Sequence, residues 1–331
     1  MQRNLLNLFG FIVLLLLGMF LTLSYGLVNW HTENFFVSLY ELPNRSSFAQ
    51  IIWNIRVPRL IIGVLSGGLF ALAGNIFQIV YRNKIASPDI LGINALAIFS
   101  ILVFSLIWPR TDLILLYALI GTAAGFGVIL LLSGVRKLAV SARLIVIGLA
   151  LSLVFRALSQ LILLKANQNQ QSLLFFLNGS LANTSWQNLI ICFGPAIVLV
   201  IIAFLFSRNL SLMQLPNDIV KSLGVNLYPW QLIYIAIALL MSAVAVSLSG
   251  SLGFIGLIAP NLARAIAGSV RIPRVLLFSV LIGVCLTIFA DLVGKILVYP
   301  NEIPAGLIMI FIGTPVFIYL LKSMNWSFKN E

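Results

Sequence analysis

Residues 57–80 read VPRLIIGVLSGGLFALAGNIFQIV, and no charged residue stands between Arg59 and Arg82. A helix needs about 20 mainly apolar residues to cross the hydrocarbon layer of a membrane, and this stretch meets that length. Similar apolar runs recur along nearly the whole chain, separated by short polar joints. Hydrophobic residues make up 61% of the 331 positions and charged residues only 8%, against about a quarter in an ordinary soluble domain. The sequence therefore predicts a single membrane domain over residues 1–331, with an all-α fold.

The apolar runs predict about ten transmembrane helices. Their approximate bounds are 5–28, 59–80, 90–108, 113–133, 143–165, 187–207, 230–249, 254–268, 275–297 and 304–322. The run 254–268 is short and contains Pro260, a break that is tolerated only where neighbouring helices satisfy the freed carbonyls. The first run is too long for a typical signal-peptide core and lacks a small-x-small cleavage site, so we expect it to be retained.

The basic residues predict the orientation of these helices. With the N-terminus in the cytoplasm, thirteen of the 20 lysines and arginines fall on the cytoplasmic side and six outside, with Arg156 within a span. This bias favours both termini in the cytoplasm. The net charge of +12 is spread over the ends of the apolar runs. No basic face interleaved with aromatic residues points to nucleic acid as a partner.

The sequence offers little from which a metal or catalytic site could be assembled. His31 is the only histidine, and Cys192 and Cys285 both fall inside apolar runs, where small core residues are the simplest interpretation. We therefore predict no metal site, no cofactor and no catalytic residue. The G-x-x-x-x-G-K-[ST] phosphate-binding pattern is also missing from the sequence, so we predict no ATP hydrolysis by this chain.

Small residues are grouped at helical spacing in two of the runs, which predicts close helix packing. They are Gly63, Gly67, Gly68, Ala71 and Gly74 in one run and Gly121 and Gly125 in another.

Two joints carry capping patterns. Ser87-Pro88-Asp89 predicts an N-cap and first turn for the third span, and residues 301–304 (NEIP) predict the same for the last span, with Glu302 at its positive end.

Six short sequence blocks follow one another between about residues 50 and 322. They are residues 56–60 (RVPRL) with Gln78, 82–92 (RNKIASPDILG), 178–181 (NGSL) with Trp186, 253–260 (GFIGLIAP) with Arg264, 290–291 (AD) with 302–306 (EIPAG), and 313–317 (GTPVF). Together they resemble the permease subunits of the iron-siderophore, haem and cobalamin ABC importers. Lys84 replaces the family's proline, and Asn261 stands where the family usually has histidine.

The resemblance implies a type II ABC importer permease fold in the bacterial plasma (inner) membrane. A second permease copy or a paralogue would complete a dimer around the substrate path, with an ATPase subunit pair on the cytoplasmic side and an extracytoplasmic substrate-binding protein outside. A ferric siderophore is the commonest cargo in the family, and haem, cobalamin and molybdate remain alternatives.

The same resemblance assigns roles to three groups of residues. The ATPase-coupling segment comprises Asp218, Ile219, Val220, Lys221, Ser222, Leu223 and Gly224, which otherwise reads as an ordinary amphipathic loop helix. The binding-protein docking residues are Arg56, Arg59 and Lys295, whose alternative role is anchoring at the membrane interface. The cytoplasmic gate comprises Asn83, Ile85 and Ser141.

Arg156 stands in the middle of the fifth predicted span. An arginine there costs about 2.5–3.5 kcal/mol on insertion scales, so it must face a partner or water. Two interpretations stay open: a structural ion pair with Asp291, or a path-lining residue that holds an anionic ferric chelate in transit.

An ion-coupled secondary transporter is the main rival class of protein. Such a transporter needs an intramembrane carboxylate or another ion site, and among the predicted spans only Asp291 qualifies. Lys295, four residues later, can neutralise the charge of Asp291.

Overall fold

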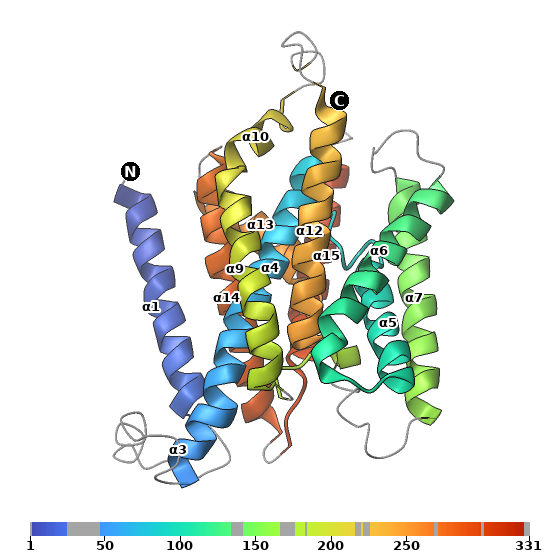
Figure 1. Cartoon of the computed structure of the whole chain (residues 1–331). Helices are drawn as coiled ribbons and strands as arrows, with labels where there is room; N and C mark the ends of the chain where they lie inside the picture. Colours follow the sequence, from blue (N-terminus) through green and yellow to red (C-terminus); the bar gives the residue numbers. More distant parts are fainter. Residues whose placement is uncertain are drawn as a thin grey trace.

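The computed structural model describes residues 2–24, 47–133, 142–165, 176–182, 184–215, 220, 226–267, 271–298 and 301–327. The elements in these ranges are all helical (Figure 1). The longer helices are α1 (Gln2–Ser24), α4 (Val57–Val80), α5 (Ile93–Ile107), α6 (Ile114–Ser133), α7 (Ala142–Lys165), α9 (Trp186–Leu205), α12 (Leu227–Ser249), α13 (Ile255–Ala267), α14 (Ile272–Leu297) and α15 (Ala305–Ser327). The short elements are α3 (Ser47–Ile51), a π turn (Ile52–Arg56), a 3₁₀ turn (Thr111–Leu113) and α10 (Ser207–Leu212).

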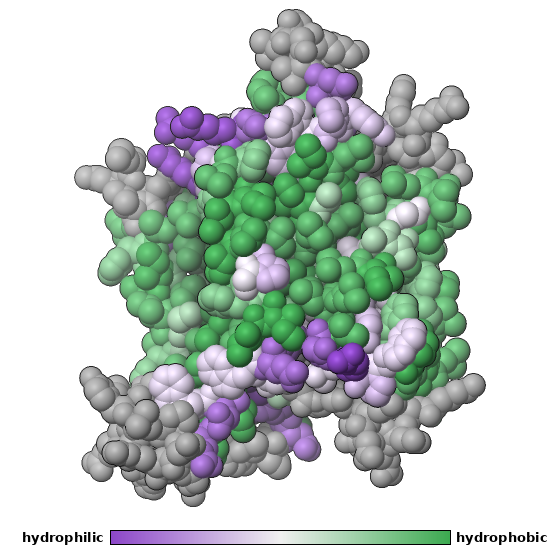
Figure 2. All heavy atoms as spheres, in the orientation of Figure 1, coloured by the Kyte–Doolittle hydropathy of each residue, from purple (hydrophilic) through white to green (hydrophobic). Residues whose placement is uncertain are grey.

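Each predicted span overlaps one of the longer helices, and residues 25–28 of the first span lie outside the described residues. Within the described residues, seven helices are long and apolar enough to cross a membrane, and α5, α13 and α15 are shorter apolar helices. Figure 2 shows hydrophobic residues over the middle of the visible face and hydrophilic residues along its upper and lower edges. This is the surface expected of a protein whose middle lies in hydrocarbon, and it confirms an all-helical membrane protein.

The two ends of the bundle carry different short helices. The short helix α10 lies at the upper end in Figure 1, and α3 lies at the lower end. We call these ends the α10 face and the α3 face. The segment that contains α4 is helical from Ser47 onward, because α3 and the π turn lead directly into it. The predicted start at residue 59 was therefore too late.

The glycine-rich helix α4 lies at the centre of the bundle. Every residue from Ser66 to Val80 is buried, and α12, α13 and α14 pack around it. A Cβ atom at Gly67 would lie 2.7 Å from the carbonyl oxygen of Gly283 on α14, and one at Gly74 would lie 1.9 Å from that of Gly256 on α13. These contacts confirm that the small residues mark close helix packing.

Other helices expose apolar side chains along most of their length. Leu153 and Leu164 on α7 are exposed, as are Phe311 and Tyr319 on α15. In water, such surfaces would drive aggregation, but in a membrane protein they face lipid or another subunit.

The two predicted capping patterns are wrong in detail. Helix α5 begins at Ile93, after Gly92, and Ser87 Oγ instead accepts a hydrogen bond from the Ile90 amide at 3.3 Å in the preceding turn. Gly92 has φ 75°, a left-handed conformation that favours glycine and allows the chain to enter the helix there. Helix α15 begins at Ala305, and the carboxylate of Glu302 forms an ion pair with Arg59.

Candidate functional site

The turn of residues 82–87 joins α4 to the segment before α5 and holds two of the predicted gate residues. Asn83 Oδ1 accepts a hydrogen bond from the Ile85 amide at 3.0 Å, and the Asn83 carbonyl accepts one from the Ala86 amide at 3.1 Å. Ile85 is buried beneath the turn. Asn83 and Ile85 therefore belong to one compact unit. Ser141, the third predicted gate residue, lies outside the described residues.

Two polar side chains attach this turn to neighbouring elements. Arg82 donates from Nε to the Met213 carbonyl at 2.8 Å and from Nη2 to the Leu215 carbonyl at 2.6 Å, just beyond α10. On the other side, Asn261 Nδ2 of α13 donates to the Lys84 carbonyl at 2.9 Å. The sequence pattern marked Asn261 only as a departure from histidine, and its anchoring contact could not be inferred from that.

Most of the predicted coupling segment lies outside the described residues. Asp218, Ile219, Lys221, Ser222, Leu223 and Gly224 belong to that part of the chain. Val220 is described and is buried, with 2% of its surface exposed. The chain enters this segment from Leu215, whose carbonyl is held by Arg82.

A cluster of four charged side chains, three of them buried and Glu302 partly exposed, joins α4, α14 and the residues before α15. Arg59 contacts Asp291 through two nitrogens, with Nη2–Oδ1 at 2.7 Å and Nε–Oδ2 at 3.0 Å. Lys295 Nζ lies 2.9 Å from Asp291 Oδ2, and Arg59 Nη1 lies 2.8 Å from Glu302 Oε2. Lys295 thus neutralises Asp291, as predicted. The cluster balances two positive charges against two negative charges, which is the condition for burying ions.

The three predicted docking residues all have partners within the chain. Arg59 and Lys295 are nearly buried in the charged cluster, with side-chain exposures of 8% and 9%. Arg56 Nη1 donates to the carbonyls of Leu23 and Ser24 at the end of α1 and stays half-buried. No described contact tests whether these residues meet a binding protein, so their docking role stays a prediction.

Arg156 does not pair with Asp291. Its Nη2 lies 3.5 Å from Oδ1 of Asp89, and the same carboxylate oxygen accepts a hydrogen bond from Ser251 Oγ at 3.0 Å. Asp291 is already occupied by Arg59 and Lys295, which excludes the structural interpretation that was predicted for Arg156. Asp89 was missed as its partner because the sequence placed that carboxylate at the start of a helix.

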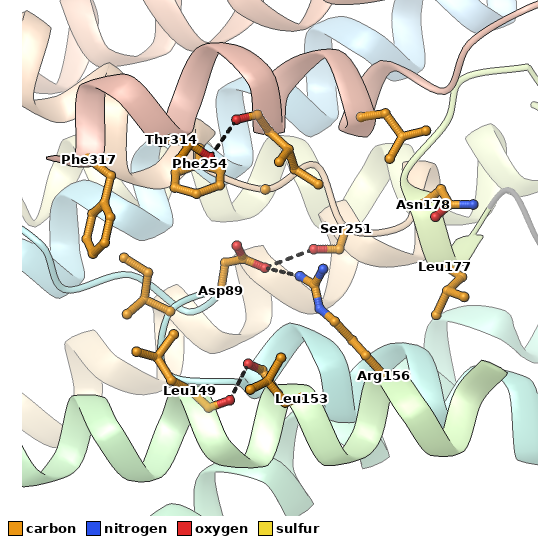
Figure 3. Close-up of a pocket in the computed structure, with 15 residues that line it drawn as sticks. Asp89, Leu149, Leu153, Arg156, Leu177, Asn178, Ser251, Phe254, Thr314 and Phe317 are labelled. Carbon is orange, nitrogen blue, oxygen red and sulfur yellow. Dashed lines mark hydrogen bonds and ion pairs between the residues drawn. The ribbon is translucent and has the colours of Figure 1, made fainter. Parts of the chain in front are cut away.

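The Asp89–Arg156 pair lies in a cavity of about 280 Å³ (Figure 3). Asp89 occupies the centre of the view, Arg156 reaches toward it from α7, and Ser251 approaches from the segment between α12 and α13. Phe254 and Phe317 line the apolar side of the cavity, and further lining comes from Leu153, Leu177, Asn178 and Thr314. The side chain of Arg156 is 42% exposed and its contact with Asp89 is long. Its guanidinium therefore has donors left for an anionic oxygen.

A family model described as the FecCD transport family matches residues 14–323. The chain belongs to this family. FecCD proteins are permeases of metal-chelate and siderophore ABC importers, so the chain is a non-enzymatic, multi-pass membrane subunit of a bacterial importer. Among the described residues, no three His, Cys, Asp or Glu side chains are grouped so that they could hold a metal ion.

Curated FecCD relatives match over most of their length. The Fe(3+) dicitrate transport system permease protein FecC of Escherichia coli is 34% identical, over 82% of this chain and 83% of its own. The Fe(3+)-citrate import system permease protein YfmD of Bacillus subtilis is 30% identical, over 82% and 81%. The iron-uptake system permease protein FeuC of the same organism is 30% identical, over 94% and 95%.

The fold also matches that of solved membrane transporters. A metal-chelate type ABC transporter in an inward-facing conformation has a TM-score of 0.77 and 27% identity, covering 96% of this chain and 98% of the other. PsaBC from Streptococcus pneumoniae, in complex with Fab, is more distant, with a TM-score of 0.55 and 16% identity. The first match supports the type II importer permease fold, and the second shows likeness of fold alone.

Proposed function

We propose that this FecCD protein is the permease of an ABC importer that carries a ferric siderophore across the bacterial plasma membrane. The single observation that carries the cargo assignment is a partly exposed arginine over a cavity within the membrane-spanning part of the protein. An intramembrane arginine with an incomplete internal partner suits an anionic cargo. Relatives named for Fe(3+)-citrate and iron uptake support a ferric chelate over haem, cobalamin or molybdate.

The proposed arrangement has ten crossings, with the α10 face in the cytoplasm and both termini on that side. The excess of lysine and arginine in the joints on this side supports it. The 82–87 turn and residues 218–224 then lie at the cytoplasmic mouth. There Asn83 and Ile85 of the turn serve as gate residues, and residues 218–224 serve as the ATPase-docking element. Ser141 is assigned to the same gate.

The proposed partners outside the membrane plane are an ATPase pair and a substrate-binding protein. The binding protein would dock on the α3 face near Arg56, Arg59 and Lys295. Because Arg59 and Lys295 already face carboxylates of this chain, acidic residues of the binding protein would have to share them. Among the described residues, Arg56 instead contacts the carbonyls of Leu23 and Ser24. Such contacts steer association more than they add affinity. A second permease, identical or paralogous, would cover the exposed apolar faces of α7 and α15.

Replacing Arg156 with glutamine (R156Q) is expected to lower ferric chelate uptake by about tenfold or more, since a hydrogen bond to a charged group is worth about 1.5–3 kcal/mol. Uptake would be measured with ⁵⁵Fe chelates in cells that lack the native permease, at matched membrane levels. Arg110→Gln is the control, because Arg110 is exposed and pairs only loosely with Asp112 at 3.6 Å. Normal uptake by R156Q would remove Arg156 from the path.

The cargo and the coupling role are tested together by an uptake panel of ferric siderophores, haem and cobalamin. Loss of one ferric siderophore's uptake in the deletion strain, restored by the wild-type gene, is the expected result. Gly224→Asp is expected not to restore it and not to copurify with the ATPase, since a new charge in a docking segment opposes packing. Asn226→Asp is the matched control because it adds the same charge while aspartate still caps α12.

The panel also separates the rival classes. Unchanged uptake of all three cargo types would leave an ABC importer of another cargo, such as molybdate. Uptake that continues without any ATPase subunit, and that follows an ion gradient, would favour a secondary transporter. Asp291 and Asp89 are described carboxylates that such a transporter could use to bind a coupling ion. Asp291 already contacts Arg59 and Lys295, and Asp89 faces Arg156, which argues against that role.

A further inference from the structure

Arg82 occupies the junction between α4 and the 82–87 turn. Its φ is 50°, in the left-handed region that residues with side chains rarely adopt. Its amide donates to the Ile79 carbonyl at 3.1 Å, and the next amide, of Asn83, donates to Gln78 at 3.1 Å. These bonds close the end of α4 and fix the direction in which the Arg82 side chain leaves the helix. The position is thus held by the backbone before the side chain makes any contact.

The Arg82 guanidinium contacts the chain where it leaves α10. The carbonyls of Met213 and Leu215 lie past the end of that helix and accept from Nε and Nη2. Carbonyls at a helix end carry partial negative charge and lack helical partners, so a cation there is stabilised. Met213 is buried, which ties this contact to the body of the protein. Capping of α10 is therefore one role of Arg82.

A cap alone does not explain what lies on either side of the contact. Leu215 is three residues before Asp218, where the proposed coupling segment begins. On the other side, Asn83 follows Arg82 directly, and its side chain shapes the gate turn. A single side chain thus connects the base of the coupling segment to the proposed gate.

The far side of the same turn is attached to α13. Asn261 donates to the Lys84 carbonyl at 2.9 Å, and Arg264 Nη2 donates to Asn261 Oδ1 at 2.9 Å and to Gln78 of α4. The turn is therefore attached by hydrogen bonds on two sides, to the residues after α10 through Arg82 and to α13 through Asn261. A displacement of either side relative to the other would either move the turn or break one of these hydrogen bonds.

We propose that Arg82 is a positioning residue that transmits movement of the ATPase-docked segment to the cytoplasmic gate. This inference rests on the proposed coupling role of residues 218–224. When ATP closes the ATPase pair, the segment moves with it, and the two hydrogen bonds from Arg82 carry that movement into the turn that contains Asn83 and Ile85. The planar guanidinium suits this role, because two donors on one rigid group reach two carbonyls and resist rotation.

The test uses the full permease purified with its co-expressed ATPase subunit. A reporter is placed in the turn by Lys84→Cys, labelled with an environment-sensitive maleimide dye. The Lys84 side chain is exposed, and the native Cys192 and Cys285 are buried. Fluorescence is recorded before and after ATP with vanadate, and ATP hydrolysis is measured separately on the same complex. Neither reading requires the cargo to be known.

Adding Arg82→Met is expected to reduce the nucleotide-dependent fluorescence change by about tenfold, within the range typical of coupling between two sites. ATP hydrolysis is expected to stay within about twofold of the parent, because the ATPase still binds and closes. Arg208→Met is the matched control: Arg208 is an exposed arginine of α10, and both readings should stay normal. Arg82→Lys keeps the positive charge but lacks the planar guanidinium with its two donor nitrogens, so it should give an intermediate fluorescence response.

The proposal is overturned if Arg82→Met retains the fluorescence change while the ATPase stays bound. Where Arg82→Met fails to assemble, Arg82→Lys decides: a reduced response with normal hydrolysis supports the proposal, and a full response overturns it. A loss of both readings in equal measure in Arg82→Lys indicates a structural role and also overturns it. If Gly224→Asp still copurifies with the ATPase, the proposed coupling segment is wrong, and that outcome is independent of the Arg82 result.

Discussion

Replacing Asp291 with asparagine (D291N) is expected to cost about 3–5 kcal/mol of folding free energy, the usual penalty for removing one partner from a buried ion pair. Asp291 is 2% exposed, and its two oxygens serve both Arg59 and Lys295. Asparagine keeps the shape but leaves two buried cations facing one carboxylate, Glu302. The amide also presents donors to these cations where the carboxylate presented acceptors.

The thermal stability of D291N would be measured in detergent with a thiol-reactive dye. Cys192 and Cys285 are free and buried, so they become reactive only as the helices separate. Asp112→Asn is the control, because Asp112 pairs with Arg110 at the exposed surface, where such pairs contribute about 0–1 kcal/mol. Equal melting of the two variants would contradict a structural role for the cluster. A second change, Lys295→Met, should restore part of the loss in D291N by removing an unpaired cation.

Replacing Gly74 with alanine (G74A) is expected to destabilise the bundle by about 3 kcal/mol, the upper part of the usual range for overpacking a core. The added Cβ would lie 1.9 Å from the carbonyl oxygen and 2.4 Å from the carbonyl carbon of Gly256. Both are backbone atoms of α13, so no side-chain rotation can relieve the clash and the two helices must separate. The same thiol-reactive dye assay measures the decrease in melting temperature.

Gly127→Ala is the matched control for G74A. A Cβ at Gly127 of α6 meets nothing within 4 Å, so alanine there should be neutral or stabilising by up to about 1 kcal/mol through helix propensity. We also expect G74A to weaken transport beyond its effect on protein level. Separation of α4 from α13 would displace Asn261, which holds the Lys84 carbonyl in the gate turn. Similar melting of the two alanine variants would contradict close α4–α13 packing.

The elements that the sequence predicted best are those that local composition decides. Apolar runs such as residues 57–80 have no stable alternative to helix in hydrocarbon, because every backbone polar group must be satisfied within the segment. The glycines at helical spacing likewise predicted close approach, although not that Gly67 would meet α14 and Gly74 would meet α13. The predicted N-caps of the helices that begin at Ile93 and Ala305 were wrong. Ser87 accepts a hydrogen bond within the preceding turn and Glu302 pairs with Arg59, so neither side chain caps these helices.

The sequence by itself determined that this chain is a helical membrane protein and, through its ordered blocks, that it resembles the siderophore permeases. The pairing of its charges was decided only by the tertiary structure. Arg59 and Asp291 are 232 residues apart, Arg156 meets Asp89 across 67 residues, and Arg82 reaches carbonyls more than 130 residues away. Periodicity reports which face of a helix is buried and does not report which neighbour covers that face. In a low-dielectric interior each charge takes the partner that packing brings within reach, and packing is a property of the whole bundle.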